Sequence, residues 1–166
     1  MDIVVADANI FVYLFRCQLL SKLLSNDLHK VVITDAVFDE LTNTSKRISR
    51  EHPTLRQNIL SSVHNTKNSD KLQIISIDAM TDLNAVKIYY ELEESGELDL
   101  GEIESIPLTL DLDGIFVSHD ADAIEIANQI KQGLGVLFLS FCKELVDRQI
   151  FSTENLGRIE KFLEQY

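Results

Sequence analysis

Short apolar runs alternate along the chain with longer segments whose apolar residues recur at helical intervals. The apolar runs, which predict buried strands, are residues 3–6, 31–34, 72–75, 114–118 and 136–139. The segments with helical spacing are residues 8–15, 18–25, 36–44, 54–66, 80–94, 120–131, 140–148 and 153–165. Strands that alternate with helices predict a parallel sheet with helices on both faces. We therefore expect an α/β fold, a three-layer α/β/α sandwich around a mostly parallel five-stranded sheet.

The length of 166 residues suits a single domain, residues 1–166, with enough mass to bury a core. Internal repeats and domain linkers are absent from the sequence. The polar segment 42–53 is expected to be a loop or an insertion. No apolar run is long enough to cross a membrane, so we expect no membrane partner. Cys17 and Cys142 lie within apolar helical patterns and favour buried thiols over a disulfide, which together with the absence of a signal-peptide pattern indicates the cytoplasm.

The net charge of −12 argues against a general nucleic-acid binder, because phosphate contacts normally come from Lys and Arg. Its distribution is uneven. Residues 46–71 contain two acidic side chains, Glu51 and Asp70, against six basic ones. The basic ones are Lys46, Arg47, Arg50, Arg56, Lys67 and Lys71. This segment is either a local basic surface on an acidic protein or an ordinary solvated helix surface.

Two acidic residues follow predicted strands in equivalent places. Asp7 comes directly after the first strand, and Asp120 lies two residues beyond Ser118, at the end of the fourth. In an open parallel sheet, ligands bind beyond the carboxyl ends of the strands, and the two acids would lie side by side if their strands were neighbours. Each also precedes a helix, so each could simply be an N-cap.

Two further carboxylates fall near the inner faces of helices. Glu40 follows Val37 by three positions, within the apolar stripe of the predicted helix 36–44, and a charge there is costly unless it is paired, binds a cation or reaches water. Glu102 precedes Ile106 by one helical turn, although an acid in a first turn also interacts favourably with the helix dipole. Pro107 implies that this helix either starts late, with Pro107 near its first position, or is kinked.

These four carboxylates come from distant segments and would repel one another if the fold brought them together. A hard divalent cation with oxygen ligands, Mg²⁺ or Mn²⁺, would relieve that repulsion. Such an ion can polarise a phosphoryl oxygen and lower the pKa of bound water, which supports phosphodiester hydrolysis. Asp122 is a fifth candidate ligand, or an exposed acid in a first helical turn.

Four blocks of the sequence resemble those of the PIN-domain family, in order and spacing. The blocks are Val5-Ala-Asp7-Ala-Asn9-Ile-Phe11, Thr34-Asp-Ala-Val-Phe-Asp-Glu40-Leu41, Leu100-Gly-Glu102-Ile-Glu-Ser-Ile106 and Val117-Ser-His-Asp120-Ala-Asp122-Ala123. The resemblance covers about residues 1–140 and makes the basic segment 46–71 a helical insertion relative to the shortest members.

The resemblance implies a ribonuclease that uses Mg²⁺ or Mn²⁺, held by Asp7, Glu40, Glu102 and Asp120 with Asp122 as an accessory ligand. Asn9 and Ser118 would be polar helpers, and Lys46, Arg47, Arg50 and Arg56 would bind the RNA. Many such proteins are toxins of toxin–antitoxin pairs, which implies an antitoxin partner, and some form homodimers. Pro107 and the acidic net charge depart from the family pattern, which keeps open an inactive member that binds proteins.

A different enzyme class is suggested by Asp111-Leu-Asp113-Gly114, which imitates the Asp-x-Asp-Gly signature of haloacid-dehalogenase-like phosphatases. That alternative requires a strand before Asp111, where Pro107 is unfavourable. A turn before the fourth strand explains the same residues.

Overall fold

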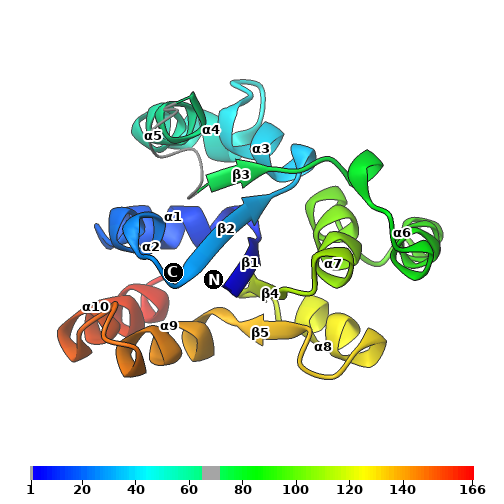
Figure 1. Cartoon of the computed structure of the whole chain (residues 1–166). Coiled ribbons are helices and arrows are strands. Elements are labelled where there is room, and N and C mark those ends of the chain that lie inside the picture. The colour runs from blue at the N-terminus through cyan, green and yellow to red at the C-terminus, as the bar shows by residue number, and fades with distance from the viewer. Residues whose placement is uncertain (1, 65–71) are drawn as a thin grey trace.

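Five parallel strands form the centre of the molecule, a computed structural model of which describes residues 2–64 and 72–166 (Figure 1). The strands are β1 (Asp2–Ala6), β2 (His29–Ile33), β3 (Leu72–Ile74), β4 (Ile115–Ser118) and β5 (Gly135–Leu137). Their order is β3-β2-β1-β4-β5, and Val5 of β1 is in register with Val32 of β2 and Phe116 of β4. The predicted fold class is confirmed, and β1 and β4, which lead to Asp7 and Asp120, are neighbours.

Helices cover both faces of this sheet. Their bounds are α1 (Ala8–Arg16), α2 (Leu20–Ser25), α3 (Asp35–Thr42), α4 (Arg47–Glu51), α5 (Pro53–His64), α6 (Leu83–Ser95), α7 (Leu100–Leu112), α8 (Ala121–Ile130), α9 (Phe138–Asp147) and α10 (Thr153–Glu164), with a 3₁₀ turn at Ile77–Ala79. Helices α1, α2, α5, α9 and α10 lie on one side, and α7 and α8 on the other with α6 outside α7 (Figure 1). Helix α3 contacts α1, α5 and α7, so it bridges the two sides.

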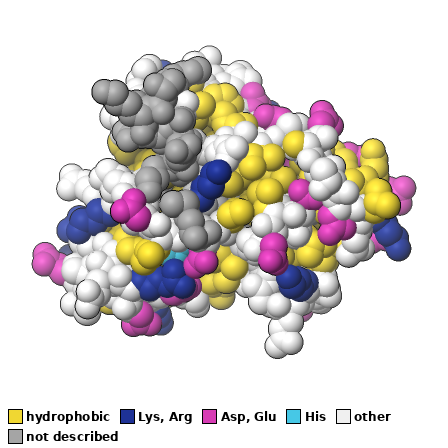
Figure 2. All heavy atoms as spheres, viewed as in Figure 1, with side chains coloured by type: hydrophobic (Ala, Val, Ile, Leu, Met, Phe, Trp, Pro, Cys, Tyr) yellow, Lys and Arg dark blue, Asp and Glu magenta, His cyan; other side chains and the backbone are white. Residues whose placement is uncertain are grey.

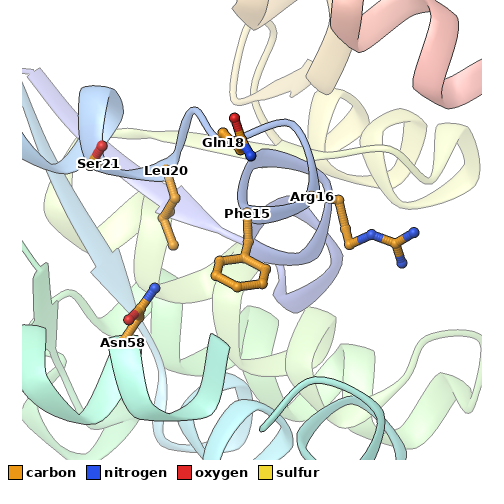
Figure 3. Close-up of a pocket in the computed structure, with 6 residues that line it drawn as sticks. All are labelled: Phe15, Arg16, Gln18, Leu20, Ser21 and Asn58. Carbon is orange, nitrogen blue, oxygen red and sulfur yellow. The ribbon is translucent and has the colours of Figure 1, made fainter. Parts of the chain in front are cut away.

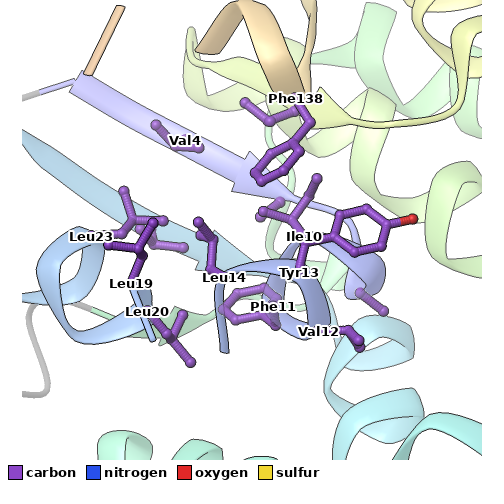
Figure 4. Close-up of a cluster of buried hydrophobic side chains, with 14 of the residues drawn as sticks. Val4, Ile10, Phe11, Val12, Tyr13, Leu14, Leu19, Leu20, Leu23 and Phe138 are labelled. Carbon is purple, nitrogen blue, oxygen red and sulfur yellow. The ribbon is translucent and has the colours of Figure 1, made fainter. Parts of the chain in front are cut away.

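The core follows from the alternation of side chains along the buried strands. Val4 and Val31 pack into the larger cluster with α1, whereas Val5 and Val32 pack on the opposite face against Leu108 of α7. All four valines are at most 1% exposed, as expected for strands covered on both faces. Figure 4 shows the part of the larger cluster that anchors α1 beneath the sheet. This anchoring fixes the start of α1, and with it Asp7.

The segment 42–53, predicted as a loop or an insertion, is partly helical. Helix α4 occupies Arg47–Glu51, and α5 begins at Pro53, where proline is favourable because a first-turn N–H has no intrahelical acceptor. The buried side chain of Ile48 anchors α4 to the core. The loop alternative is therefore wrong for residues 47–51, because tertiary packing outweighs the polar composition of this stretch, whereas the helical insertion stays a prediction. Lys67 and Lys71 of the basic segment lie outside the described residues.

Helix α7 runs through Pro107, so of the two alternatives left open by the sequence, the late start near this proline is wrong. The helix begins at Leu100 and ends at Leu112, with Asp99 as its N-cap. Pro107 cannot donate a hydrogen bond to the carbonyl of Ile103, and burial of the helix against the sheet compensates for this loss. Glu102 consequently occupies the first turn of a fully formed helix.

The haloacid-dehalogenase-like phosphatase alternative requires a strand before Asp111, but helix α7 occupies these residues. Asp111 lies in the last turn of α7, and its Oδ1 accepts hydrogen bonds from the backbone N–H groups of Thr81 and Asp82, at 2.9 and 2.8 Å. Asp113 is the C-cap of α7, with a φ of 54°. Asp111 therefore joins the start of α6 to the end of α7, and Asp113 ends α7 before β4.

Two other expectations concern the whole chain. Cys17 and Cys142 are free, buried thiols, as predicted. Within residues 2–64 and 72–166, every helix is too short or too polar to span a lipid bilayer.

Candidate functional site

Asp7 lies at the carboxyl end of β1, where it is the N-cap of α1. Its Oδ1 accepts a hydrogen bond from the N–H of Ala8 at 2.8 Å, and its Oδ2 accepts one from the hydroxyl of Ser118 at 3.3 Å. Only 7% of the residue is exposed. Capping and a functional role are therefore compatible here, because one oxygen satisfies the helix while the other faces the end of the neighbouring strand.

Asp120 joins Asp7 at this edge because β4 pairs directly with β1. The Ser118 hydroxyl, which donates to Asp7, also accepts the N–H of Asp120 at 3.1 Å, so one side chain connects the two strand ends. Asp120 is the N-cap of α8, and its Oδ1 accepts the N–H of Asp122 at 2.9 Å. The geometry matches the rule that ligand sites of parallel sheets lie beyond the carboxyl ends of the strands.

Glu102 reaches the same place from α7. Asp99 caps this helix by accepting the N–H of Glu102 at 2.9 Å, and Glu102 is 5% exposed. Asp120 also acts on Glu102, because its negative charge and a side-chain interaction between the two carboxyl groups both raise the pKa of Glu102.

These side chains surround a hollow of about 220 Å³. The residues that line it are Asp7, Asn9, Tyr13, Asp99, Glu102, Ser118, His119 and Asp120. The exposed His119 packs edge-on against the Tyr13 ring, with centroids 5.5 Å apart. The Tyr13 ring belongs to the core, and its hydroxyl points away from the apolar cluster (Figure 4). Acidic side chains and the rings of Tyr13 and His119 thus line the same hollow.

Glu40 flanks this hollow from α3. It is half-buried, and its Oε1 lies where a side chain on Gly101 would otherwise be, 2.8 Å from the position of a Cβ. The carboxylates of Asp7 and Asp99 are close enough to raise its pKa. Three of the four acids predicted from the sequence therefore line the hollow, and the fourth, Glu40, lies near Asp7.

The pKa values of three of these acids are raised. Burial raises the pKa of Asp7 to about 6, that of Glu40 to about 7 and that of Glu102 to about 8. The second cause is a neighbouring negative charge, Asp99 for Asp7 and Glu102, and Asp7 for Glu40. Among the described residues, none of the four predicted acids forms an ion pair with a Lys or Arg side chain. Their mutual repulsion therefore lacks a direct cationic partner within that part of the chain.

The donor set fits a hard divalent cation, because every candidate ligand is a carboxylate oxygen in a partly desolvated hollow. The side chains do not converge fully. In the part of the chain that the structure describes, no group of three Asp, Glu, His or Cys residues is placed to hold a metal ion. Mutual repulsion opposes the closer approach of these carboxylates, and a shared cation would relieve it.

The other predicted site residues differ in their placement. Asn9 and Ser118 line the hollow, whereas Asp122 is exposed and lines an adjoining hollow together with Asp120 and Glu125. Asp122 is therefore connected to the predicted site through Asp120, which lines both hollows.

Most of the predicted RNA-binding residues lie on the surface of α4 and just before it. Lys46, Arg47 and Arg50 are exposed. Arg56 is half-buried, and its guanidinium donates to the carbonyl of Ser49 at 3.2 Å, which is a structural contact between α5 and α4. On the face drawn in Figure 2, acidic and basic side chains are interspersed.

Sequence reasoning missed Asp99. This residue lines the hollow and contributes to the raised pKa of Asp7, Glu40 and Glu102. A signal was present, because Asp99 and Glu102 have the three-residue spacing of an N-cap and an acidic first turn.

A larger hollow, of about 490 Å³, lies elsewhere between the α1–α2 turn and α5 (Figure 3). Its lining residues are Phe15, Arg16, Gln18, Leu20, Ser21 and Asn58. Figure 3 shows the Arg16 guanidinium directed away from the other labelled side chains. Because its lining contains no carboxylate, this hollow lacks the ligands for a hard cation.

Comparisons with known proteins give one family and several structures. A family model described as a PIN domain matches residues 3–141. The structure is similar to that of VapBC2 from Rickettsia felis, crystallised with a DNA fragment from its promoter, with a TM-score of 0.53 and 19% identity over 81% of this chain and 98% of that one. It is also similar to a PilT N-terminus domain protein from Sulfolobus solfataricus P2, with a TM-score of 0.43 and 14% identity over 88% and 92%. No curated protein matches the sequence.

Proposed function

Because the chain belongs to the PIN-domain family, we propose that it is a ribonuclease that hydrolyses phosphodiester bonds with the help of Mg²⁺ or Mn²⁺. The observation that carries this proposal is that Asp7, Glu102 and Asp120 line one hollow and Glu40 lies near Asp7, with the pKa values of Asp7, Glu40 and Glu102 raised. Keeping such acids together destabilises a fold, and strongly perturbed pKa values cluster at functional sites.

Each acid has its own part in holding the cation. Asp7 and Asp120, at adjacent strand ends, would be the rigid ligands, while Glu40 and Glu102 would close in from α3 and α7. The bound ion would polarise a phosphoryl oxygen and lower the pKa of a water molecule. Asp122 remains a candidate accessory ligand that would have to approach from the adjoining hollow.

Neighbouring polar groups orient these ligands. Ser118 contacts both Asp7 and Asp120, so its hydroxyl sets their relative position. Asn9 offers an uncharged amide to the substrate from the wall of the hollow. Burial, together with Tyr166 and Asp7, raises the pKa of Tyr13, which keeps its phenol protonated as a hydrogen-bond donor at neutral pH.

The direct test is cleavage of mixed RNA by the purified protein. We expect cutting with Mn²⁺ and none with a chelator, together with a Tm that rises on addition of Mn²⁺ because the ion binds only the folded state. Ca²⁺, which prefers longer ligand distances and higher coordination numbers, serves as the control ion. Intact RNA in every condition would end the nuclease proposal.

A catalytically inactive PIN fold that binds other proteins is the second candidate. It is favoured by the acidic net charge and, among the described residues, by the lack of three metal-binding side chains already in place. Mn²⁺ distinguishes the two functions, since an inactive site leaves Tm unchanged when the ion is added.

We propose that the exposed side chains of Lys46, Arg47 and Arg50 contact the phosphates of the RNA. Replacing the three with glutamine is expected to weaken RNA binding and to reduce the slope of log K against log salt by about 0.7 for each lost phosphate contact. The measurement is fluorescence anisotropy of labelled RNA over a range of salt concentrations. The exposed Lys87 of α6, which pairs with Glu91, provides the control substitution. An unchanged slope in the triple variant would place the RNA elsewhere.

Arg56→Gln should instead lower Tm, because the guanidinium of Arg56 joins α5 to α4.

We further propose that the protein is the toxin of a toxin–antitoxin pair, as the family resemblance implies, with an antitoxin as partner and a homodimer as a candidate assembly. A small antitoxin-like reading frame beside this gene would supply the partner, and its product should suppress the cleavage of RNA.

A further inference from the structure

Helices α3 and α7 meet at two points, and both involve one face of α7. Gly101 and Glu104 are three residues apart, so they lie on the same side of the helix. The Oε1 of Glu104 accepts the backbone N–H of Ala36 at 3.0 Å. Ala36 is the second residue of α3, where N–H groups have no intrahelical acceptor and a carboxylate interacts favourably with the helix dipole. Glu104 therefore fixes the start of α3 against α7.

The second contact lies further along α3, at Glu40. A Cβ on Gly101 would lie 2.8 Å from the Oε1 of Glu40, closer than the 3.0 Å that real Cβ atoms keep. It would meet Val37 and Asp99 at 3.4 and 3.5 Å, which are ordinary contacts. The φ of Gly101 lies outside the left-handed region, so the backbone does not require glycine here. What this position requires is space for the Glu40 carboxylate.

We propose that Gly101 and Glu104 are positioning residues that hold the Glu40 carboxylate at the site. Glu104 sets the position of α3 at its first turn, and Gly101 leaves the space that the carboxylate of Glu40 occupies one turn later. The consequence for metal binding rests on the proposed function, in which Glu40 is a ligand. The consequence for the position of Glu40 does not.

Alanine at position 101 separates the effect on the site from an effect on folding. The conflicting atom is the end of a flexible side chain, so Glu40 can swing away at small cost, and alanine is a better helix former than glycine. Gly101→Ala should therefore keep Tm at or above that of the wild type, while Mn²⁺ binding, measured by titration calorimetry, weakens by about tenfold or more. Gly157, in α10, is the matched control, because a Cβ there would meet no atom within 4 Å.

A double-mutant cycle shows whether Gly101 acts through Glu40. In a Glu40→Ala background the conflicting carboxylate is gone, so adding Gly101→Ala should change the Kd for Mn²⁺ by less than about twofold. An equal loss of affinity in both backgrounds would overturn the proposal. For Glu104, glutamine retains an acceptor oxygen and should preserve Mn²⁺ binding, whereas alanine should weaken it; equal effects of the two would remove Glu104 from the proposal.

The position of Glu40 is also measured without metal. The ¹³C resonance of its side-chain carboxyl should shift in Gly101→Ala and remain unchanged in Gly157→Ala. No shift in Gly101→Ala would overturn the positioning role. A shift in a protein whose wild type fails to bind Mn²⁺ would leave the positioning role intact and overturn the proposed function alone.

Discussion

Asp7→Asn is expected to abolish Mn²⁺-dependent RNA cleavage and to stabilise the metal-free protein. The loss of rate should exceed the roughly 10- to 100-fold typical of residues that only support a metal ligand. Asparagine caps helices as well as aspartate does, so the hydrogen bond from Ala8 can remain. Burial and the charges of Asp99 and Asp120 raise the pKa of Asp7 to about 6, so above that pH the substitution removes a buried, repelled charge. Cleavage assays and thermal unfolding with a chelator measure the two effects.

Asp113→Asn is the control for this experiment. Asp113 caps the C-terminal end of α7 with a positive φ that asparagine also adopts, and its Oδ1 is 3.3 Å from the Nζ of Lys131. The substitution removes one surface carboxylate and should leave cleavage unchanged. The reverse outcome, with activity lost in Asp113→Asn and retained in Asp7→Asn, would contradict the assignment of the site and favour chemistry at the Asp111–Asp113 turn.

The sheet and the acids at its edge were predictable because each depends on a local pattern. Buried parallel strands are continuous apolar runs; Asp7 directly follows β1, and Asp120 lies two residues beyond the end of β4. The ends of elements were less predictable. Residues 136–139 form one apolar run, but β5 ends at Leu137 and α9 begins at Phe138, since a buried strand and a buried helix start have the same composition.

Features that depend on contacts between distant segments could not be obtained from the sequence. Helix α4 is polar, and the burial of Ile48 holds it against the core. Helix α7 tolerates Pro107 because the helix packs against β1 and β4 of the sheet. Asp99 affects the site through its distance from three other carboxylates, which no spacing in the sequence reveals. Likewise, the sequence indicates only that Gly101 is a glycine near a helix start. That its position leaves space for the Glu40 carboxylate follows only from the folded structure. The family resemblance, confirmed over residues 3–141, predicted the four acids and the helpers Asn9 and Ser118, but it gave no role to Asp99, Gly101 or Glu104.

The metal-free protein is expected to lose stability as the pH rises from about 4.5 to about 8.5, and Glu102→Gln to reduce that loss. Burial and the neighbouring Asp99 and Asp7 raise the pKa of Glu102 from 4.5 to about 8, and Glu40 shifts in the same direction to about 7. The folded state therefore binds more protons than the unfolded state in this range. The stability that these protons contribute is fully present below the unfolded pKa and is lost as the pH rises through the folded pKa.

Glutamine at position 102 imitates the protonated acid, because it is uncharged and its amide can donate a hydrogen bond. At pH 8.5 the variant should unfold about 5 °C above the wild type, which corresponds to roughly 1–2 kcal/mol for a chain of this size. At pH 4.5, where Glu102 carries its proton, the two should unfold together. Glu125→Gln, which removes an exposed acid from α8, controls for the general effect of lowering the negative charge. Parallel Tm curves for wild type and Glu102→Gln would show that Glu102 loses its proton as readily in the folded protein as in the unfolded chain. Mn²⁺ should raise the Tm of the wild type most at high pH, since a dication and the proton of Glu102 relieve the same repulsion and only the proton is lost there.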